Sequence, residues 1–111
     1  CRIFFMDNNF PSYVNFYSSI KSISILDLKK LLEEKGWLSR KESWTDFELN
    51  NNWSQFSLIK STDDELLLNG FIKNPSINYF VLIELLKKSN VEFIAELYDE
   101  AGEIKYNNQS S

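Results

Sequence analysis

Three strand-like runs separated by two very short polar gaps constrain this chain more than any other feature. The runs cover residues 44–49, 53–60 and 65–73, and the gaps are Asn-Asn-Asn at 50–52 and Ser-Thr-Asp-Asp at 61–64. Asn, Asp and Ser bond locally to the backbone and favour turns. Connections this short join antiparallel neighbours, because a parallel pair needs a long crossover. The sequence therefore predicts an antiparallel meander.

The third run admits a second interpretation. A helix capped by Thr62, with Glu65 as the third residue of a capping box, would cover the same segment. Asn69 and Gly70 in its middle disfavour that helix, since both residues have low helix propensity. Apolar residues at odd and even positions of 65–73 predict instead a strand that is largely buried.

A first helix is indicated over residues 25–35. Ser24 precedes it as a candidate N-cap with Asp27 three residues later, and Gly36 stands where a left-handed C-terminal cap belongs. Between these ends, Leu28, Leu31 and Leu32 form an apolar stripe at helical spacing. We expect this helix to pack on the sheet through that stripe.

A second helix begins at Asn74 and Pro75, the strongest start signal in the chain. Asn is a favoured N-cap, and Pro is favoured at the first helical position. Apolar residues cover most of the helix circumference, so we expect it to be the hub of the core: Ile77, Phe80, Val81, Leu82, Ile83, Leu85 and Leu86.

The carboxyl-terminal part has the pattern of a hairpin. Residues 91–97 place Val, Phe, Ala and Leu at alternate positions, which is typical of a half-exposed strand. Residues 99–102 form the predicted turn, with Gly102 in a left-handed conformation and a return strand through Ile104 and Tyr106. We expect residues 107–111 to be frayed.

The first 23 residues are harder to interpret. Residues 2–6 are a short strand-like run, Pro11 can begin a helix, and residues 13–20 fit either a helix or a strand. With the other elements, the predicted fold class is α+β. We expect a single domain over residues 1–111, with an antiparallel sheet of about five strands packed on one face by two or three helices.

The chain lacks the residues that most enzymes and zinc sites require. It contains no histidine and one cysteine, Cys1. Histidine supplies most acid-base catalysis at neutral pH, and zinc sites draw on His and Cys. Paired carboxylates at Asp46 and Glu48, or at Glu92 and Glu96, are a possible cation site. Such pairs are common on solvated strands, so we expect no enzyme activity, no cofactor and no metal.

The apolar runs, such as residues 79–83, are too short to cross a membrane. Cys1 has no partner for a disulfide, and a lipid-modified cysteine at this position would need the polar tether that residues 2–5 do not provide. No signal peptide is recognisable. We therefore expect a cytoplasmic protein without membrane contact.

Charge is unevenly distributed along the chain. The net charge is −4, yet residues 21–41 carry more bases than acids, whereas residues 42–65 carry six acids against Lys60 alone. Residues 92–103 carry five acids and no base. An acidic sheet repels phosphate and attracts a basic protein, so we expect no direct nucleic-acid binding. The alternative is that these charges only keep a solvated surface soluble.

Tryptophans flank the acidic run. Trp is enriched at binding hot spots because it buries a large area while keeping a donor available, although in a small domain it is more often a core residue. The predicted partner-binding residues combine both features: Trp44, Asp46, Glu48, Trp53, Asp63, Asp64 and Glu65.

In size, acidity, aromatic content and α+β order, the chain resembles the immunity proteins of bacterial toxins, including those of contact-dependent growth inhibition. That resemblance implies a cytoplasmic protein that binds one cognate toxin, commonly a basic nuclease domain, and blocks its active site. The basic segment 21–41 would then lie away from the contact.

Two alternatives belong to other functional classes. One is a small-ligand or regulatory module with a cavity between the sheet and the helix at residues 77–86. The other is a homo-oligomeric subunit in which exposed Phe and Trp side chains bury each other.

Overall fold

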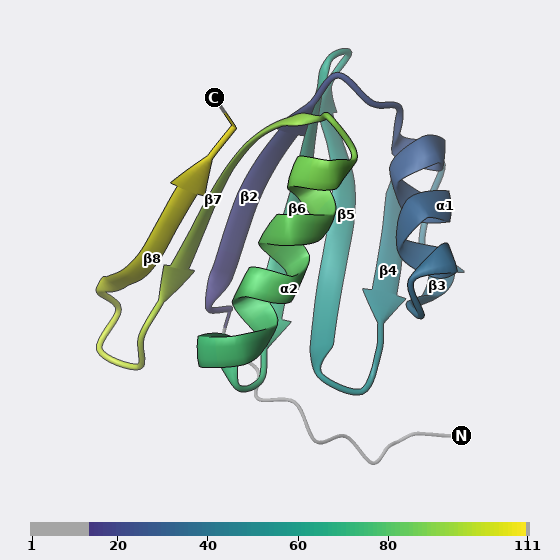
Figure 1. Ribbon diagram of the computed structural model, residues 1–111. Coiled ribbons are helices and arrows are strands. Elements are labelled where there is room, and N and C mark those ends of the chain that lie inside the picture. Colours follow the sequence, from purple (N-terminus) through teal and green to yellow (C-terminus); the bar gives the residue numbers. More distant parts are fainter. Residues whose placement is uncertain (1–13, 111) are drawn as a thin grey trace.

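The computed structural model describes residues 14–110, which form one antiparallel sheet and two helices (Figure 1). The predictions for residues 2–6 and Pro11 lie outside the described residues. The elements in chain order are β2 (Phe16–Lys21), α1 (Ile25–Glu34), β3 (Leu38–Lys41), β4 (Asp46–Asn50), β5 (Ser54–Thr62), β6 (Glu65–Ile72), α2 (Pro75–Lys88), β7 (Glu92–Tyr98) and β8 (Ile104–Gln109).

The sheet has the strand order β3-β4-β5-β6-β2-β7-β8, with every neighbouring pair antiparallel. The α+β class and the meander through β4, β5 and β6 are confirmed. The described sheet has seven strands rather than about five. Residues 16–21, which fitted either a helix or a strand, form β2 and lie between β6 and β7. The other added strand, β3, has four residues of which three are polar, too few for a readable alternation.

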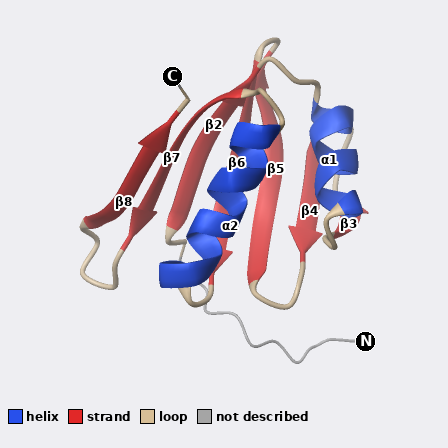
Figure 2. Ribbon diagram, viewed as in Figure 1, coloured by secondary structure: helices blue, strands red, loops and turns tan. Residues whose placement is uncertain are grey.

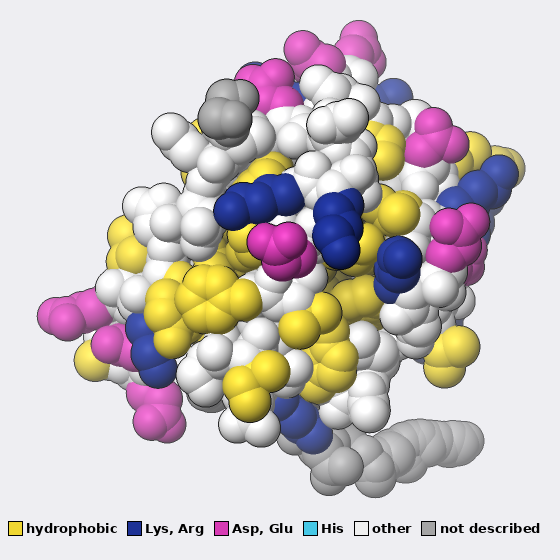
Figure 3. Space-filling model, viewed as in Figure 1, with side chains coloured by type: hydrophobic (Ala, Val, Ile, Leu, Met, Phe, Trp, Pro, Cys, Tyr) yellow, Lys and Arg dark blue, Asp and Glu magenta, His cyan; other side chains and the backbone are white. Residues whose placement is uncertain are grey.

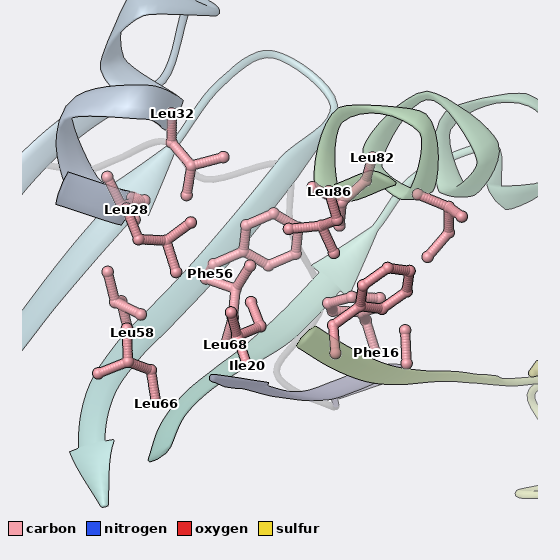
Figure 4. Packing of buried hydrophobic residues seen from close by; sticks show 14 of the residues in the cluster. Phe16, Ile20, Leu28, Leu32, Phe56, Leu58, Leu66, Leu68, Leu82 and Leu86 are labelled. Atoms are coloured by element: carbon pink, nitrogen blue, oxygen red, sulfur yellow. The ribbon is translucent and has the colours of Figure 1, made fainter. Parts of the chain in front are cut away.

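Both helices cover the same face of the sheet (Figure 2), as predicted. α1 packs on β4 and β5, and α2 packs on β6 and β7. Between the layers lies one cluster of apolar side chains from every strand except β3 and β8 (Figure 4). Phe16 and Phe56 meet at its centre with ring centroids 5.4 Å apart. Burial of this cluster is the main source of stability.

The first helix follows its sequence signals. The Ser24 hydroxyl oxygen accepts a hydrogen bond from the Asp27 backbone N–H at 3.1 Å, which satisfies one of the donors left free at a helix start. Leu28 and Leu32 are buried. The helix ends at Glu34, and Gly36 takes a φ of 109°, a region that favours glycine. The predicted helix is therefore confirmed, one residue shorter than expected.

The second helix begins where predicted but is capped differently. Asn74 has left-handed angles (φ 47°, ψ 58°) and makes no capping hydrogen bond through its side chain. Instead, the Asn78 amide donates to the Lys73 carbonyl oxygen at 2.7 Å. The left-handed turn lets the chain pass sharply from β6 into α2, and it directs the Asn74 side chain away from the helix amides.

The expectation that α2 is the hub of the core is wrong for part of its circumference. Tyr79, Leu82, Ile83 and Leu86 are buried, whereas Ile77, Phe80 and Val81 are exposed. A helix on one face of a single sheet has neighbours on one side only. The remaining apolar residues therefore form a hydrophobic area on the outer surface of α2 (Figure 3).

Two residues at the start of β2 and the end of β6 join these strands without regular pairing. Buried Asn15 acts like a backbone unit, because its amide donates to the Ile72 carbonyl and its oxygen accepts from the Ile72 N–H at 2.9 Å. Gly70 approaches β5 so closely that an added Cβ would lie 1.9 Å from the Gln55 carbonyl oxygen. No side chain fits at Gly70.

The β7–β8 hairpin has the predicted alternation and turn. Phe93, Ala95 and Leu97 are buried, and Gly102 has a positive φ of 84°. The expected fraying from residue 107 is wrong up to Ser110, whose N–H donates to the Phe93 carbonyl at 2.9 Å. Tyr79 explains this order, since its hydroxyl donates to Asn108 Oδ1 at 2.8 Å.

Candidate functional site

The sheet face opposite the helices, called the open face below, carries the side chains that alternate with the core residues. It is defined by the following residues: Tyr17, Ser19, Lys21, Leu38, Arg40, Asp46, Glu48, Asn50, Gln55, Ser57, Ile59, Glu65, Leu67, Asn69, Phe71, Glu92, Ile94, Glu96, Tyr98, Asn107 and Gln109. No described helix or strand packs on it. This face is half-buried rather than fully exposed at its centre, because neighbouring side chains shield one another.

Its charge is predominantly negative. Five carboxylates lie on it, from Asp46, Glu48, Glu65, Glu92 and Glu96, against the two bases Lys21 and Arg40. Arg40 is engaged within the face, since its guanidinium pairs with Glu42 at 2.6 Å and with Glu48 at 3.5 Å. Among the described residues, Asp46, Glu92 and Glu96 form no ion pair. Their charge is available to an approaching partner.

A shallow hollow of about 460 Å³ lies at the centre of the open face, over β6, β2 and β7. Its apolar walls come from Tyr17, Leu67 and Ile94, the last of which is 52% exposed. The carboxylates of Glu65, Glu92 and Glu96 surround it together with Lys21. An apolar centre within a charged margin is the usual anatomy of a protein interface.

Hydrogen bonds within the open face hold several of these groups in place. Ser19 Oγ donates to Glu65 Oε2 at 2.5 Å, and the Tyr98 hydroxyl donates to Glu96 Oε1 at 3.0 Å. That bond to Glu96 raises the pKa of the Tyr98 hydroxyl. Tyr98 also meets Tyr17 edge to face, with centroids 5.4 Å apart. Two of the carboxylates and two aromatic rings are thus preorganised, which lowers the entropic penalty of binding.

The predicted site residues separate into three groups. Asp46, Glu48 and Glu65 lie on the open face, and Asp63 and Asp64 lie in the exposed turn between β5 and β6. Asp46 and Glu48 share one face, as the period of a strand predicts.

The tryptophans have different environments. Trp44 is 87% exposed in the loop between β3 and β4, with the Lys41 ammonium 3.7 Å from its ring centroid. Trp53 packs edge to face on buried Trp37, with centroids 5.1 Å apart, so much of its surface belongs to the core cluster. Trp37 itself is buried and donates from Nε1 to Ser54 Oγ at 2.8 Å. Of the three rings, Trp44 is therefore the one presented to a partner.

The expectation that segment 21–41 lies away from the acidic surface is wrong for two of its bases. Lys21 stands opposite Glu92 in the sheet register, and Arg40 stands opposite Glu48. The reason is topological: β2 inserts between β6 and β7, and β3 pairs with β4. Lys29, Lys30 and Lys35 lie on or beside α1, on the helix side.

Sequence reasoning missed the hollow. Tyr17 and Ile94 are the omitted residues, and Glu92 and Glu96 were considered only as a possible cation site. Ile94 carried a signal, since it is an apolar residue at the exposed phase of an alternating strand. Tyr17 carried none, because its segment fitted two kinds of structure.

No metal site is evident in the part of the chain that the structure describes, where no three His, Cys, Asp or Glu side chains converge closely enough to hold an ion. Neither of the helices within residues 14–110 combines the length and hydrophobicity needed to cross a membrane. Comparison with protein-family models, with curated proteins and with solved structures finds no match. Function must therefore be inferred from the open face itself.

Proposed function

We propose that this protein binds a basic protein partner on its open face and blocks that partner's activity, in the manner of an immunity protein acting on a bacterial toxin domain. The observation that carries the proposal is the hollow of Tyr17, Leu67 and Ile94, surrounded by carboxylates on a face that no described element covers. Interfaces of this composition combine apolar affinity with electrostatic steering.

The charge of the open face favours a basic protein over a nucleic acid. Its five carboxylates outnumber its two bases, one of which is already paired. A phosphate backbone would be repelled, whereas the basic substrate-binding surface of a nuclease would be attracted. Occupying that surface is sufficient to exclude its substrate, so inhibition requires no catalytic group on this chain.

Binding is proposed rather than catalysis because the available chemistry suits it. The chain has no histidine, and the hollow is wide and shallow instead of enclosing a substrate. The ligand cavity considered under α2 is a weaker candidate, since Tyr79, Leu82 and Leu86 are fully buried in the space between α2 and the sheet.

The test compares two double variants with equal change of charge. Asp46→Lys with Glu92→Lys reverses two unpaired carboxylates of the open face, and Glu34→Lys with Glu84→Lys reverses two exposed carboxylates of the helices. Each immobilised protein is exposed to lysate of the source organism, and retained proteins are identified by mass spectrometry. We expect the wild type and the helix variant to retain one basic protein.

The captured protein is then titrated with each variant. We expect the open-face variant to bind about 100-fold more weakly, with a smaller dependence on salt. Stoichiometric wild-type protein should also abolish the captured protein's cleavage of DNA or RNA. Equal binding by the two double variants, or capture of an acidic partner, would contradict the proposal.

A further inference from the structure

The outer edge of β8 has unpaired backbone groups. The Ser110 N–H donates to the Phe93 carbonyl, which makes these two a hydrogen-bonded pair of the antiparallel ladder. Because such pairs alternate, Asn108 and Tyr106 also bond toward β7, and the N–H and C=O groups of Asn107 and Gln109 point away from it. β8 is the last strand of the sheet, and no described strand pairs with this edge.

This edge lacks the usual protection against strand pairing. Natural edge strands are commonly very short or carry several charges or a proline. β8 has six residues, Ile-Lys-Tyr-Asn-Asn-Gln, with one charge and no proline. The opposite edge, β3, is different, since it has four residues and two of them are the cations Arg40 and Lys41.

A hydrophobic area adjoins the same edge on the helix side. Phe80 of α2 is 42% exposed and meets Tyr106 of β8 with ring centroids 4.8 Å apart. Tyr106 in turn stacks on buried Tyr79 at 5.1 Å. Ile77, one turn before Phe80, is 64% exposed. Hydrophobic side chains thus gather over α2 and toward β8 (Figure 3), next to the free backbone groups.

We infer that two copies of this chain pair through β8, so that the two sheets become continuous and the Phe80–Tyr106 areas of both copies cover each other. A second copy fits because the strand is complementary to itself in antiparallel orientation. With the two-fold axis at Asn107, Lys105 of each copy lies opposite Gln109 of the other, so no like charges meet. The closed two-fold arrangement stops at a dimer.

The dimer is independent of the proposed function and compatible with it. Pairing at β8 uses the edge of the sheet and its helix side, and it leaves the hollow on the open face uncovered in both copies. One strand pair and a few rings form an interface smaller than that of a tight permanent dimer. We expect a dissociation constant of about 10 μM.

The test is sedimentation equilibrium of the purified chain from ~1 to ~100 μM, which brackets that constant. We expect the wild type to shift from monomer to dimer. Asn107→Pro removes an N–H that has no partner within the described sheet, so the fold tolerates it while the edge is blocked. Phe80→Glu places a charge in the contact. Both variants should remain monomeric, with wild-type circular dichroism.

Leu38→Glu is the matched control, because Leu38 is 78% exposed on the opposite edge strand and should not affect dimerisation. Amide hydrogen exchange gives a second readout that needs no substitution: the Asn107 and Gln109 amides should exchange more slowly as concentration rises. A wild type that is monomeric at every concentration would overturn the inference. So would dimerisation of Asn107→Pro and Phe80→Glu equal to that of the wild type.

Discussion

The two faces of the sheet are made from alternate residues of the same strands, yet they differ in what they carry. On the helix side, Phe16, Leu68 and Phe93 are almost completely buried in one apolar cluster. On the open face, their sequence neighbours Tyr17, Leu67 and Glu92 surround a hollow and remain accessible. The difference suggests a division of labour: the covered face supplies stability, and the open face is free to carry charge for binding.

The largest expected effect separates two adjacent leucines of β6. Leu68 is fully buried on the helix side, whereas Leu67 is half-buried on the open face. We expect Leu68→Ala to lower the free energy of unfolding by about 3 kcal/mol, through lost burial and the cavity left behind. Leu67→Ala should lower it by about 1 kcal/mol or less. Urea unfolding measures both, and equal losses would contradict the proposed division between the faces.

An intermediate effect concerns tyrosine ionisation. Burial, followed by the charge of Glu96, raises the pKa of the Tyr79 hydroxyl to about 12 from its ordinary value of 10.0. Above pH ~10 the unfolded chain loses this proton first, so the stabilisation is complete below that pH and is lost as the pH rises toward 12. We expect the free energy of unfolding to fall by about 2 kcal/mol over this range.

Tyr79→Phe should flatten this alkaline loss, because the replaced ring has no proton to lose. Tyr98→Phe is the control on the open face, where the hydroxyl is held by Glu96 rather than by deep burial, and it should keep the loss. Unfolding curves at a series of alkaline pH values test this. The interpretation fails if Tyr79→Phe and the wild type lose the same free energy.

The smallest expected effect is on the open face itself. Asp46 and Glu92 have no ion-pair partner among the described residues, so replacing either by Lys removes no favourable contact. We expect each substitution to change the free energy of unfolding by less than about 0.5 kcal/mol. Thermal and urea unfolding of the single variants provide the measurement. A loss of several kcal/mol would mean that these carboxylates have a structural role, and the comparison between the faces would need revision.

Much of the fold was predictable because its signals are local. Ser24 and Asp27 lie within one helical turn, so their capping contact depends on no distant residue. Alternation through β7 determines which side chains face the core, and the polar gaps set the connections of β4, β5 and β6. The shared face of Asp46 and Glu48 follows from the same period.

The candidate site was predictable only in part, because its centre joins strands that are distant in sequence. Tyr17, Leu67 and Ile94 come from three strands that meet only because β2 inserts between β6 and β7. That insertion also brought Lys21 beside the carboxylates, against expectation. Trp53 shows the converse case, since its neighbour in space, Trp37, determines that it packs on the core.

The sequence by itself determined the identity of the helices, the meander, the hairpin and the acidic character of one sheet face. Each of these depends on residues within a few positions of one another, where spacing and backbone preference act directly. The tertiary structure decided the order of the strands, the position of the hollow and which side of α2 remains uncovered. Those features depend on which elements meet across the sheet, and burial rather than local preference selects that arrangement.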